Sequence, residues 1–515
     1  MKMTTSNICI LISIIVYLAV VVYIGVAFSR KNKTTDDFYL GGRRLGPFVT
    51  AMSAEASDMS SWLLMGLPGV AYVTGLADAF WTAAGLAIGT YINWLIVAKR
   101  LRKYTVKCKN STTIPVFFSN RYRDDKNILS LIAAIVIIVF FVPYTASGFA
   151  ACGKLFSTLF DADYVVAMVI SAIVIVGYTT LGGFLAASTT DFIQSIIMSI
   201  AIVVVLGYGV ATAGGIGAVA DNARSMAGYF NLTAIHDAAS NSASSYGAIT
   251  IASTLAWGLG YFGMPHILLR FMAIENPKKL TLSRRIATVW VVISMGVAIM
   301  IGIVGNAMTK ASVIPSLSDG ETIIIVIAQV IASHGVLAAL IAGLILAGIL
   351  AATMSTADSQ LLAAASSVSQ NIIKEVVFKD LSEKAAMIIA RVSVVLISLV
   401  AMFIARDPNS SVFGIVSFAW AGFGAAFGPV VLLALFWKRS NKWGALSGMV
   451  AGGVMVFVWK FLVRPLGGAW NIYELLPAFI VAILVNVLVS LLTKAPSKEI
   501  VDEFEAVNAE LKAEK

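Results

Sequence analysis

The chain has 515 residues, of which 59% are hydrophobic and only 12% are charged, with a mean hydropathy of +0.89. Soluble domains carry roughly 25% charged residues, so this composition excludes a large soluble domain and predicts a polytopic membrane protein. The net charge of +10 would suit a nucleic-acid partner, but its distribution among the loops, given below, explains it without one.

Cysteine and histidine usage excludes two further classes of site. The three cysteines, Cys9, Cys108 and Cys152, show no Cys-x-x-Cys spacing and predict no disulfide framework. The three histidines lie far apart, and no nucleotide-binding loop or catalytic triad stands out. We therefore expect no metal centre, no cofactor and no enzymatic activity.

Thirteen apolar stretches are long enough to cross a bilayer. The first has no small-residue cleavage pattern and is followed by others, so it is an anchor and not a signal peptide. The segment 322–370 is either a helix pair or one extended helix. The predicted spans are 7–29, 45–74, 78–98, 128–157, 164–182, 189–213, 246–270, 286–307, 322–370, 386–404, 411–437, 443–463 and 473–493.

Alternate loops are basic. Six segments contain 29 of the 37 lysines and arginines, namely 30–44, 99–127, 270–285, 371–385, 438–442 and 494–515. The positive-inside bias places these segments in the cytoplasm, the N-terminus outside and the C-terminus inside, in a plasma (inner) membrane. The loop 214–245 is then external and contains a short helix, and the charged tail 494–515 is a solvated helix or a disordered end.

The stretch 54–69, AEASDMSSWLLMGLPG, places Glu55, Ser57, Asp58, Ser60 and Ser61 inside an apolar span. Ionisable groups at membrane depth normally face a bundle interior or a water-filled cavity. The glycines and proline that follow, Gly66, Pro68 and Gly69, disrupt the helix, and irregular backbone is tolerated there only where protein or a solute satisfies it. The stretch predicts a discontinuous helix that lines a binding site; the alternative is a kinked helix whose polar groups bind its neighbours.

A second interrupted span lies about 200 residues further on, at 246–272, with Gly258, Gly260, Gly263 and Pro265. Paired interrupted helices in two halves point to a transporter site. Each opens a block of five spans, and an odd number reverses the orientation, so we expect two inverted repeats. The predicted organisation is an N-terminal helix and loop (1–44), the repeats 45–213 and 246–437 separated by the external loop 214–245, two C-terminal helices (438–493) and the tail 494–515.

Aromatic side chains gather near both interruptions. Trp257 and Tyr261 are four residues apart and share a helix face. With Trp62 and Tyr144 they form either an aromatic box around a small amphipathic solute or an ordinary packing cluster.

The segment 349–360, ILAATMSTADSQ, introduces Ser355, Thr356, Asp358 and Ser359 into an alanine-rich helix. Such hydroxyls often bond to their own helix. Alternatively, they supply the oxygen ligands that a hard monovalent cation requires, which would make this a sodium site. Asp191 is a further acid, near the cytoplasmic end of its span, where it either serves a site or contacts interfacial water.

These motifs resemble the sodium/solute symporter family, and within it the proline branch. The resemblance rests on segments 41–69, 143–148 (PYTASG), 257–272 (WGLGYFGMPHILLRFM) and 354–362 (MSTADSQLL), and it extends over the whole span region. It implies an all-α, LeuT-type fold of two inverted five-helix repeats, with one helix before them and two after. It also implies inward sodium movement coupled to uptake of L-proline by alternating access, without an obligate protein partner.

The resemblance also implies roles for individual residues. Sodium would be held by the carbonyls of Ala56, Met59 and Ala352 and the hydroxyls of Ser355 and Thr356. Asp58 would couple sodium to substrate, and Arg43 would belong to a cytoplasmic gate. The proline site would comprise Ser60, Ser61, Trp62, Tyr144, Trp257, Tyr261 and Pro265.

The chain departs from the family pattern at three positions. Ser61 stands where the proline branch has glycine, and Glu55 and Asp358 stand where small or hydroxyl residues are expected. Some relatives hold a second sodium at positions matching Asp191, Asp358 and Ser359. Asp358 would either strengthen such a site or, when protonated, contribute nothing. Sodium stoichiometry is therefore left open.

Two other classes of function, a channel and a sensor, have less support in the sequence. A channel would need repeated filter motifs, and a sensor of this family would carry an appended kinase domain; we find neither in this sequence. Within the symporter class, the alternative is a sodium symporter of the same family that transports another small organic solute.

Overall fold

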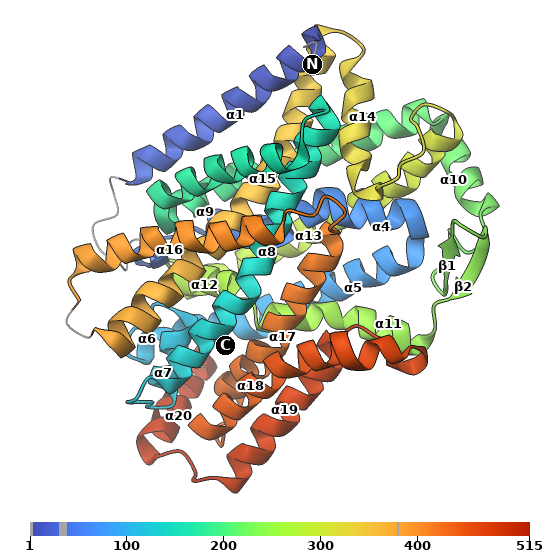
Figure 1. Ribbon diagram of the computed structural model, residues 1–515. Helices are drawn as coiled ribbons and strands as arrows, with labels where there is room; N and C mark the ends of the chain where they lie inside the picture. Colours follow the sequence, from blue (N-terminus) through green and yellow to red (C-terminus); the bar gives the residue numbers. More distant parts are fainter. Residues whose placement is uncertain (1–3, 30–38, 379–380, 515) are drawn as a thin grey trace.

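The computed structural model describes residues 4–29, 39–378 and 381–514 (Figure 1). Within them the chain is helical apart from one antiparallel hairpin, which pairs β1 (Ala234–Asp237) with β2 (Ser242–Ser245). Part of the basic segment 30–44 lies outside the described residues.

The described part of the first half of the chain contains nine α-helices, some joined by short turns of wider or narrower helix. These are α1 (Thr5–Ser29), α3 (Pro47–Ser61), α4 (Leu67–Thr74), α5 (Leu76–Ile92), α6 (Lys99–Lys107), α7 (Ile114–Arg121), α8 (Ile128–Phe160), α9 (Tyr164–Thr212) and α10 (Gly215–Ser225).

The described part of the second half contains ten α-helices. These are α11 (Ala248–Leu255), α12 (Pro265–Ala273), α13 (Leu280–Lys310), α14 (Ile323–Ala332), α15 (Val336–Ser366), α16 (Glu383–Ile404), α17 (Val412–Phe436), α18 (Lys442–Val458), α19 (Leu475–Leu492) and α20 (Lys498–Ala513).

Ten helices of the described chain are long and apolar enough to cross a membrane. The protein is therefore an all-α, multi-pass membrane protein. The predicted count of thirteen is not confirmed, because α3–α4, Tyr164–Thr180 and Ala248–Phe262 are not among the ten. The ambiguous segment 322–370 proves to be a helix pair, α14 and α15.

The centre of the molecule is the first interrupted helix, α3–α4. Every residue from Thr50 to Gly69 is buried, and α15, α9, α13 and α12 pack around α3. This segment is too polar for lipid, and its burial places Glu55 and Asp58 inside protein, as expected for ionisable groups at membrane depth.

The predicted discontinuity of this helix is confirmed, but it lies earlier than the glycines and proline suggested. Ser60 adopts φ +50° and ψ −171° inside α3, and a wide helical turn, Trp62–Gly66, follows. Pro68 lies in the first turn of α4, where a missing N–H costs nothing. Gly69 serves a different purpose, since a Cβ there would lie 2.8 Å from the backbone nitrogen of Glu321.

The second interrupted helix breaks as predicted. Helix α11 ends at Leu255, a narrow 3₁₀ segment covers Ala256–Phe262, and α12 begins at Pro265. The 3₁₀ segment packs against α5 at a glycine contact, because a Cβ on Gly89 would lie 2.3 Å from the carbonyl oxygen of Gly258.

The two interrupted helices are joined by backbone hydrogen bonds at one end. The N–H of Leu45, just before α3, donates to the carbonyl of Ala273 at 3.1 Å, and the N–H of Glu275 donates to the carbonyl of Leu45 at 3.0 Å. The start of α3 therefore lies beside the end of α12. Further along, Ser53 contacts Arg270 and Asp58 contacts Tyr261, so the two interrupted helices run in opposite directions.

The charged tail is an ordered helix. The residues of α20 that pack on the protein are Ile500, Phe504 and Val507, and its carboxylates pair with bases of α6 and neighbouring loops. In Figure 1, α20 lies with α6 and α7 on one side of the molecule, whereas α10 and the hairpin lie on the other. The loop 214–245 contains the expected short helix, α10, together with the hairpin, which the sequence analysis did not predict.

Candidate functional site

Aromatic side chains from both interrupted helices meet at the centre of the molecule. The rings of Trp62 and Trp257 lie 5.7 Å apart between centroids. A small cavity of about 10 Å³ lies beside them, which is room for about one water molecule. Its lining residues are Asp58, Met59, Trp62, Leu86, Tyr144, Trp257, Val416 and Trp420. Three of the four aromatics of the predicted box therefore share one cavity, and a larger solute would require the rings to move.

Asp58 connects the elements around this cavity. Its Oδ2 atom accepts a hydrogen bond from the Tyr261 hydroxyl at 2.6 Å, and its backbone carbonyl accepts one from the Tyr144 hydroxyl at 3.0 Å. Its Oδ1 atom is buried and has no hydrogen-bond partner in the described chain. Tyr261 thus joins the box through Asp58, although it does not line the cavity.

Helix α17 supplies aromatics that the sequence analysis missed. Phe413 lies 5.8 Å from Trp62 and 5.5 Å from Trp257. The indole N–H of Trp420 donates to the carbonyl of Trp257 at 2.7 Å. These rings therefore pack against the aromatic box. No spacing rule connects α17 to a helix more than 150 residues away, so only the fold reveals them.

The predicted sodium ligands come together where α15 crosses the first interrupted helix. The Ser355 hydroxyl lies 2.9 Å from the carbonyl oxygen of Ala56 and 3.0 Å from that of Ala352. The Thr356 hydroxyl is buried beside them without a hydrogen-bond partner in the described chain. This is an oxygen-rich cluster without a net charge, which suits a hard monovalent cation.

Met59 and the two serines that follow it lie next to the break. The Met59 carbonyl accepts a hydrogen bond from the Trp62 N–H, which also contacts the Ser60 hydroxyl at 3.1 Å. The Ser61 hydroxyl is buried and has no partner in the described chain. The roles of all these residues as ligands stay predictions.

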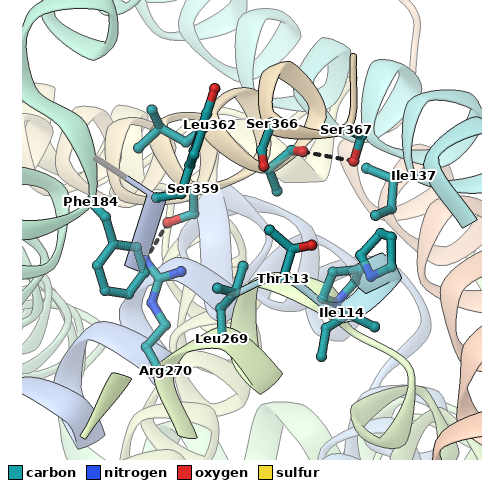
Figure 2. Close-up of a pocket in the computed structure, with 14 residues that line it drawn as sticks. Thr113, Ile114, Ile137, Phe184, Leu269, Arg270, Ser359, Leu362, Ser366 and Ser367 are labelled. Carbon is teal, nitrogen blue, oxygen red and sulfur yellow. Dashed lines mark hydrogen bonds between the residues drawn. The ribbon is translucent and has the colours of Figure 1, made fainter. Parts of the chain in front are cut away.

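The predicted second sodium site already holds a cation of the protein itself. Arg270, on α12, is fully buried and donates through Nη2 to Asp191 Oδ2 at 3.1 Å. Arg270 also donates from this nitrogen to the Ser359 hydroxyl at 2.5 Å, the contact that Figure 2 shows. Its Nε atom lies 3.0 Å from the Ser53 hydroxyl, which in turn donates to Asp191 at 2.7 Å. Asp191 is 0% exposed, so the alternative of contact with interfacial water is wrong.

Arg270 was placed incorrectly by sequence reasoning, whereas the assignment of Pro265 stays a prediction. Arg270 was counted with the basic loop 270–285 but lies inside the bundle. Pro265 was assigned to the proline site but lines a different cavity of about 20 Å³, together with Arg270 and Ser359. A lone arginine in an apolar span is a signal for a functional or paired group and could have identified Arg270.

The two unexpected acids have separate partners. Asp358 accepts a hydrogen bond from the Thr179 hydroxyl of α9, and its other oxygen has no partner in the described chain. Glu55 accepts a hydrogen bond from the Trp94 indole at 2.9 Å. Asp358 thus belongs to the region around Asp191 and Arg270, and Glu55 belongs to the contact between α3 and the helix that follows α5.

Arg43 lies at the end of the molecule where α3 begins. Its guanidinium donates to the carbonyls of Met272 and Ser111, each at 2.7 Å, and to the Asn110 side chain at 3.1 Å. It therefore ties the end of α12 to the loop that follows α6. This position agrees with the predicted gate, although the gating role itself is untested.

A cluster of ion pairs lies beside α4, in the wall of a cavity of about 480 Å³. The Lys154 ammonium lies 2.7 Å from Glu321 and 2.7 Å from Asp319. Glu321 also accepts hydrogen bonds from the Ser411 hydroxyl at 2.9 Å and from the backbone N–H groups of Val412 and Phe413, each at 3.0 Å. This carboxylate caps α17 directly beside Phe413 and so holds that ring over the box.

Comparison with known proteins agrees with these features. A model of the Sodium:solute symporter family matches residues 38–452. The chain is 43% identical to the high-affinity proline transporter PutP of Bacillus subtilis over 93% of this chain and 97% of that protein. It is 39% identical to the osmoregulated proline transporter OpuE of the same organism (95% and 96% covered) and 41% identical to a sodium/proline symporter of Staphylococcus aureus (94% and 93% covered).

Two solved structures share the fold. A sodium-coupled sialic acid symporter in a substrate-bound outward-open state superimposes with a TM-score of 0.77 over 95% of this chain and 99% of that one, at 18% identity. The nucleobase-cation-symport-1 family transporter Mhp1, in a closed conformation, gives 0.52 over 91% and 98%, at 13% identity. A chain with this family match is a transporter and not an enzyme. The protein belongs to the sodium:solute symporter family.

Proposed function

We propose that the chain couples inward sodium movement to uptake of L-proline by alternating access. One observation carries the mechanism: the Ser355 hydroxyl lies within 3.0 Å of the carbonyls of Ala56 and Ala352, a few residues from Trp62. Sodium at this cluster would order the interrupted helix, and the ordered helix would present the box to substrate. The substrate assignment rests on three relatives that are named for proline.

The chemistry of the box suits a proline zwitterion. Backbone N–H groups at a broken helix suit the carboxylate, and aromatic faces suit both the ring and the secondary ammonium. We place proline against Trp62, Tyr144 and Trp257, with Phe413 and Trp420 covering it.

The same proposal includes the finer topology. Ten long spans together with the interrupted helices α3–α4 and α11–α12 and the span Tyr164–Thr180 would make thirteen crossings, in two inverted five-helix repeats. The antiparallel course of α3 and α12 supports the inversion. The basic loops would place α6, α7 and α20 in the cytoplasm of a cell with this protein in its plasma membrane, and α10 outside.

The energetics are adequate for accumulation. One positive charge moving inward yields about 2.3 kcal/mol per 100 mV, and a tenfold sodium gradient adds about 1.4 kcal/mol. Their sum, about 3.7 kcal/mol, supports an accumulation of several hundredfold for a neutral zwitterion. We propose Arg270 as a fixed cation in the region of Asp191, Asp358 and Ser359, so that one sodium ion accompanies each proline.

Uptake of radiolabelled proline into proteoliposomes tests the proposal. An inward sodium gradient should drive proline above its external concentration, and equal sodium on both sides should abolish this accumulation. Trp257→Ala should raise the apparent substrate constant, whereas Trp443→Ala, an exposed tryptophan far from the box, should not. Proline uptake that ignores sodium would refute the coupling. Preferential sodium-driven uptake of another solute would favour the alternative substrate.

A further inference from the structure

Away from the central sites, a groove of about 570 Å³ opens between α13, α9 and α3. Its floor follows one face of α13, because Ile286, Val289, Ile293 and Val297 recur at the spacing of helical turns. Val289 and Ile293 are each 58% exposed. The groove therefore presents a continuous apolar surface that no described part of this chain covers.

The groove lies within the membrane-spanning part of the molecule. The segment Pro277–Lys310 is long and apolar enough to cross a membrane. From Arg285 to Val297 the groove extends about 18 Å along the helix at about 1.5 Å per residue. One leaflet of hydrocarbon is about 15 Å thick. The groove thus has the length of a single lipid acyl chain.

A cation lies at one end of this apolar surface. Arg285 lines the groove at the basic end of α13 and is exposed. Within the described chain, its guanidinium has no hydrogen bond or ion pair, whereas the adjacent Arg284 stacks over the ring of Tyr91 at 5.5 Å. An unpaired arginine at a membrane boundary directs its charge toward the headgroups, where an anion would complement it.

The wall of the groove is fixed in place. The Trp290 indole donates to the Ser199 hydroxyl of α9 at 2.9 Å, which joins the two helices across the groove. On the third side, Met52 of α3 lines it. Met52 precedes Ser53, which contacts both Asp191 and Arg270. Whatever fills the groove therefore contacts the first interrupted helix directly.

We propose that this groove binds an anionic phospholipid of the surrounding bilayer, with one acyl chain along α13 and the phosphate on Arg285. Basic pockets between membrane helices bind anionic headgroups in this way. The charge of Arg285 selects an anionic lipid over a zwitterionic one, and the apolar floor selects a lipid over a free phosphate. The proposal does not depend on the transported solute.

The test uses the purified, delipidated protein in detergent. Native mass spectrometry counts bound lipid, and thermal unfolding reports stabilisation, as phosphatidylglycerol or phosphatidylcholine with the same acyl chains is added. We expect phosphatidylglycerol to bind more tightly and to raise the melting temperature more, since a ligand that binds only the native state stabilises it. Inorganic phosphate alone should have no effect.

Two kinds of variant separate the headgroup contact from the chain contact. Arg285→Gln should weaken phosphatidylglycerol binding about fivefold, which corresponds to about 1 kcal/mol for one cation near an anionic surface, and Arg285→Lys should retain most of it. Arg391→Gln, an exposed arginine on α16, is the matched control. Val289→Trp should fill the groove and displace both lipids.

Two results would overturn the proposal. One is equal loss of binding in Arg285→Gln and Arg391→Gln, because the headgroup would then have no preferred cation. The other is lipid binding that is unchanged in Val289→Trp. A native mass that falls from dimer to monomer in that variant, with lipid retention unchanged, would assign the groove to a second copy of this chain instead.

Discussion

At the scale of single residues, Asp58 is where three helices meet. It lies beside the break in α3, accepts a hydrogen bond from Tyr261 of the second interrupted helix, and receives the Tyr144 hydroxyl of α8 on its carbonyl. Its remaining oxygen has no partner in the described chain. Tyr261 therefore contacts the carboxylate and Tyr144 contacts the backbone carbonyl, so Asp58 connects α3 to both the second interrupted helix and α8.

We predict that Asp58→Asn weakens the mutual enhancement of sodium and proline binding. Thermodynamic reciprocity requires each ligand to tighten the other by the same factor, and the amide lacks the charge that a neighbouring cation would stabilise. The measurement is proline affinity at several sodium concentrations and the converse, in both proteins. Asp58→Glu should retain part of the effect. Full enhancement in Asp58→Asn would make the residue a purely structural acid.

Ser355→Ala and Thr356→Ala should each weaken sodium affinity far more than intrinsic recognition of proline. Each removes one of about five neutral oxygen ligands, so we expect at least a tenfold loss, corresponding to about 1.4 kcal/mol. Uptake measured across a range of sodium concentrations should therefore recover partly at saturating sodium. Thr353→Ala, which removes a hydroxyl that donates to the Ile349 carbonyl of the same helix, is the control. Unchanged sodium dependence in both variants would refute the assignment.

At the residue scale, the sequence identifies local motifs but not distant partners. Ser355 and Thr356 stand out in an alanine-rich helix, and the Ser355 hydroxyl lies 2.9 Å from the Ala56 carbonyl, whereas the role of both as sodium ligands stays a prediction. Pro265 lines another cavity, because its motif gives no direction for its side chain. The ion pair of Arg270 with Asp191 joins positions 79 residues apart, and only the fold determines that distance.

At the scale of elements, the contact between α5 and the narrow helical segment Ala256–Phe262 depends on paired glycines. A Cβ on Gly89 would meet the Gly258 carbonyl oxygen at 2.3 Å, well inside contact distance. Asn93, one turn further along, donates to the carbonyl of Tyr261 at 3.1 Å. Close packing at Gly89 therefore sets the position of the same Tyr261 that holds Asp58.

Gly89→Ala should therefore lower both thermal stability and proline affinity. Overpacking of this kind typically costs about 1–3 kcal/mol. Gly296→Ala is the matched control, because a Cβ in that helix meets nothing within 4 Å, and removing a flexible glycine should instead stabilise by up to about 1 kcal/mol. The melting temperatures of the two variants should move in opposite directions, and proline affinity should fall only in Gly89→Ala. Equal stability in both would contradict the close contact.

The two interrupted helices show which features of a helix break can be predicted from periodicity and composition. Both broken helices were predicted from polar and breaking residues within apolar spans. The first break was placed too late, because Pro68 is compatible with a helix start whereas Ser60 alone adopts the left-handed backbone. Sequence could not show this, since serine has no special preference for positive φ.

At the scale of the whole molecule, α20 lies across several elements of the basic side. Its carboxylates pair with α6 and the loops after α7 and α17, and Phe504 packs on Tyr104. Lys103 and Lys99 lower the pKa of Glu514 to about 2, so this carboxylate is charged near neutral pH. Salt, and not moderate acidity, should therefore weaken its part of the contact.

We predict that hydrogen exchange of α20 speeds up as ionic strength rises from low to about 1 M, where the screening length falls to about 3 Å. Glu503→Gln, which removes the partner of Arg123 at 2.8 Å, should exchange faster already at low salt. Asp502→Asn, an exposed acid on the same helix, should leave exchange unchanged. Salt-independent exchange would mean that the apolar contacts of Ile500, Phe504 and Val507 alone hold the helix in place.

The two backbone hydrogen bonds of Leu45 join the start of α3 to the end of α12. Because both hydrogen bonds use backbone atoms, the link is indifferent to side-chain identity. Alanine scanning would pass over it, and sequence drift at Leu45, Ala273 and Glu275 would leave it intact. Relatives could therefore exchange one cargo for another around the box while inheriting the same link unchanged. Leu45→Pro, which removes the donor of one of the two hydrogen bonds, is the substitution that would weaken it.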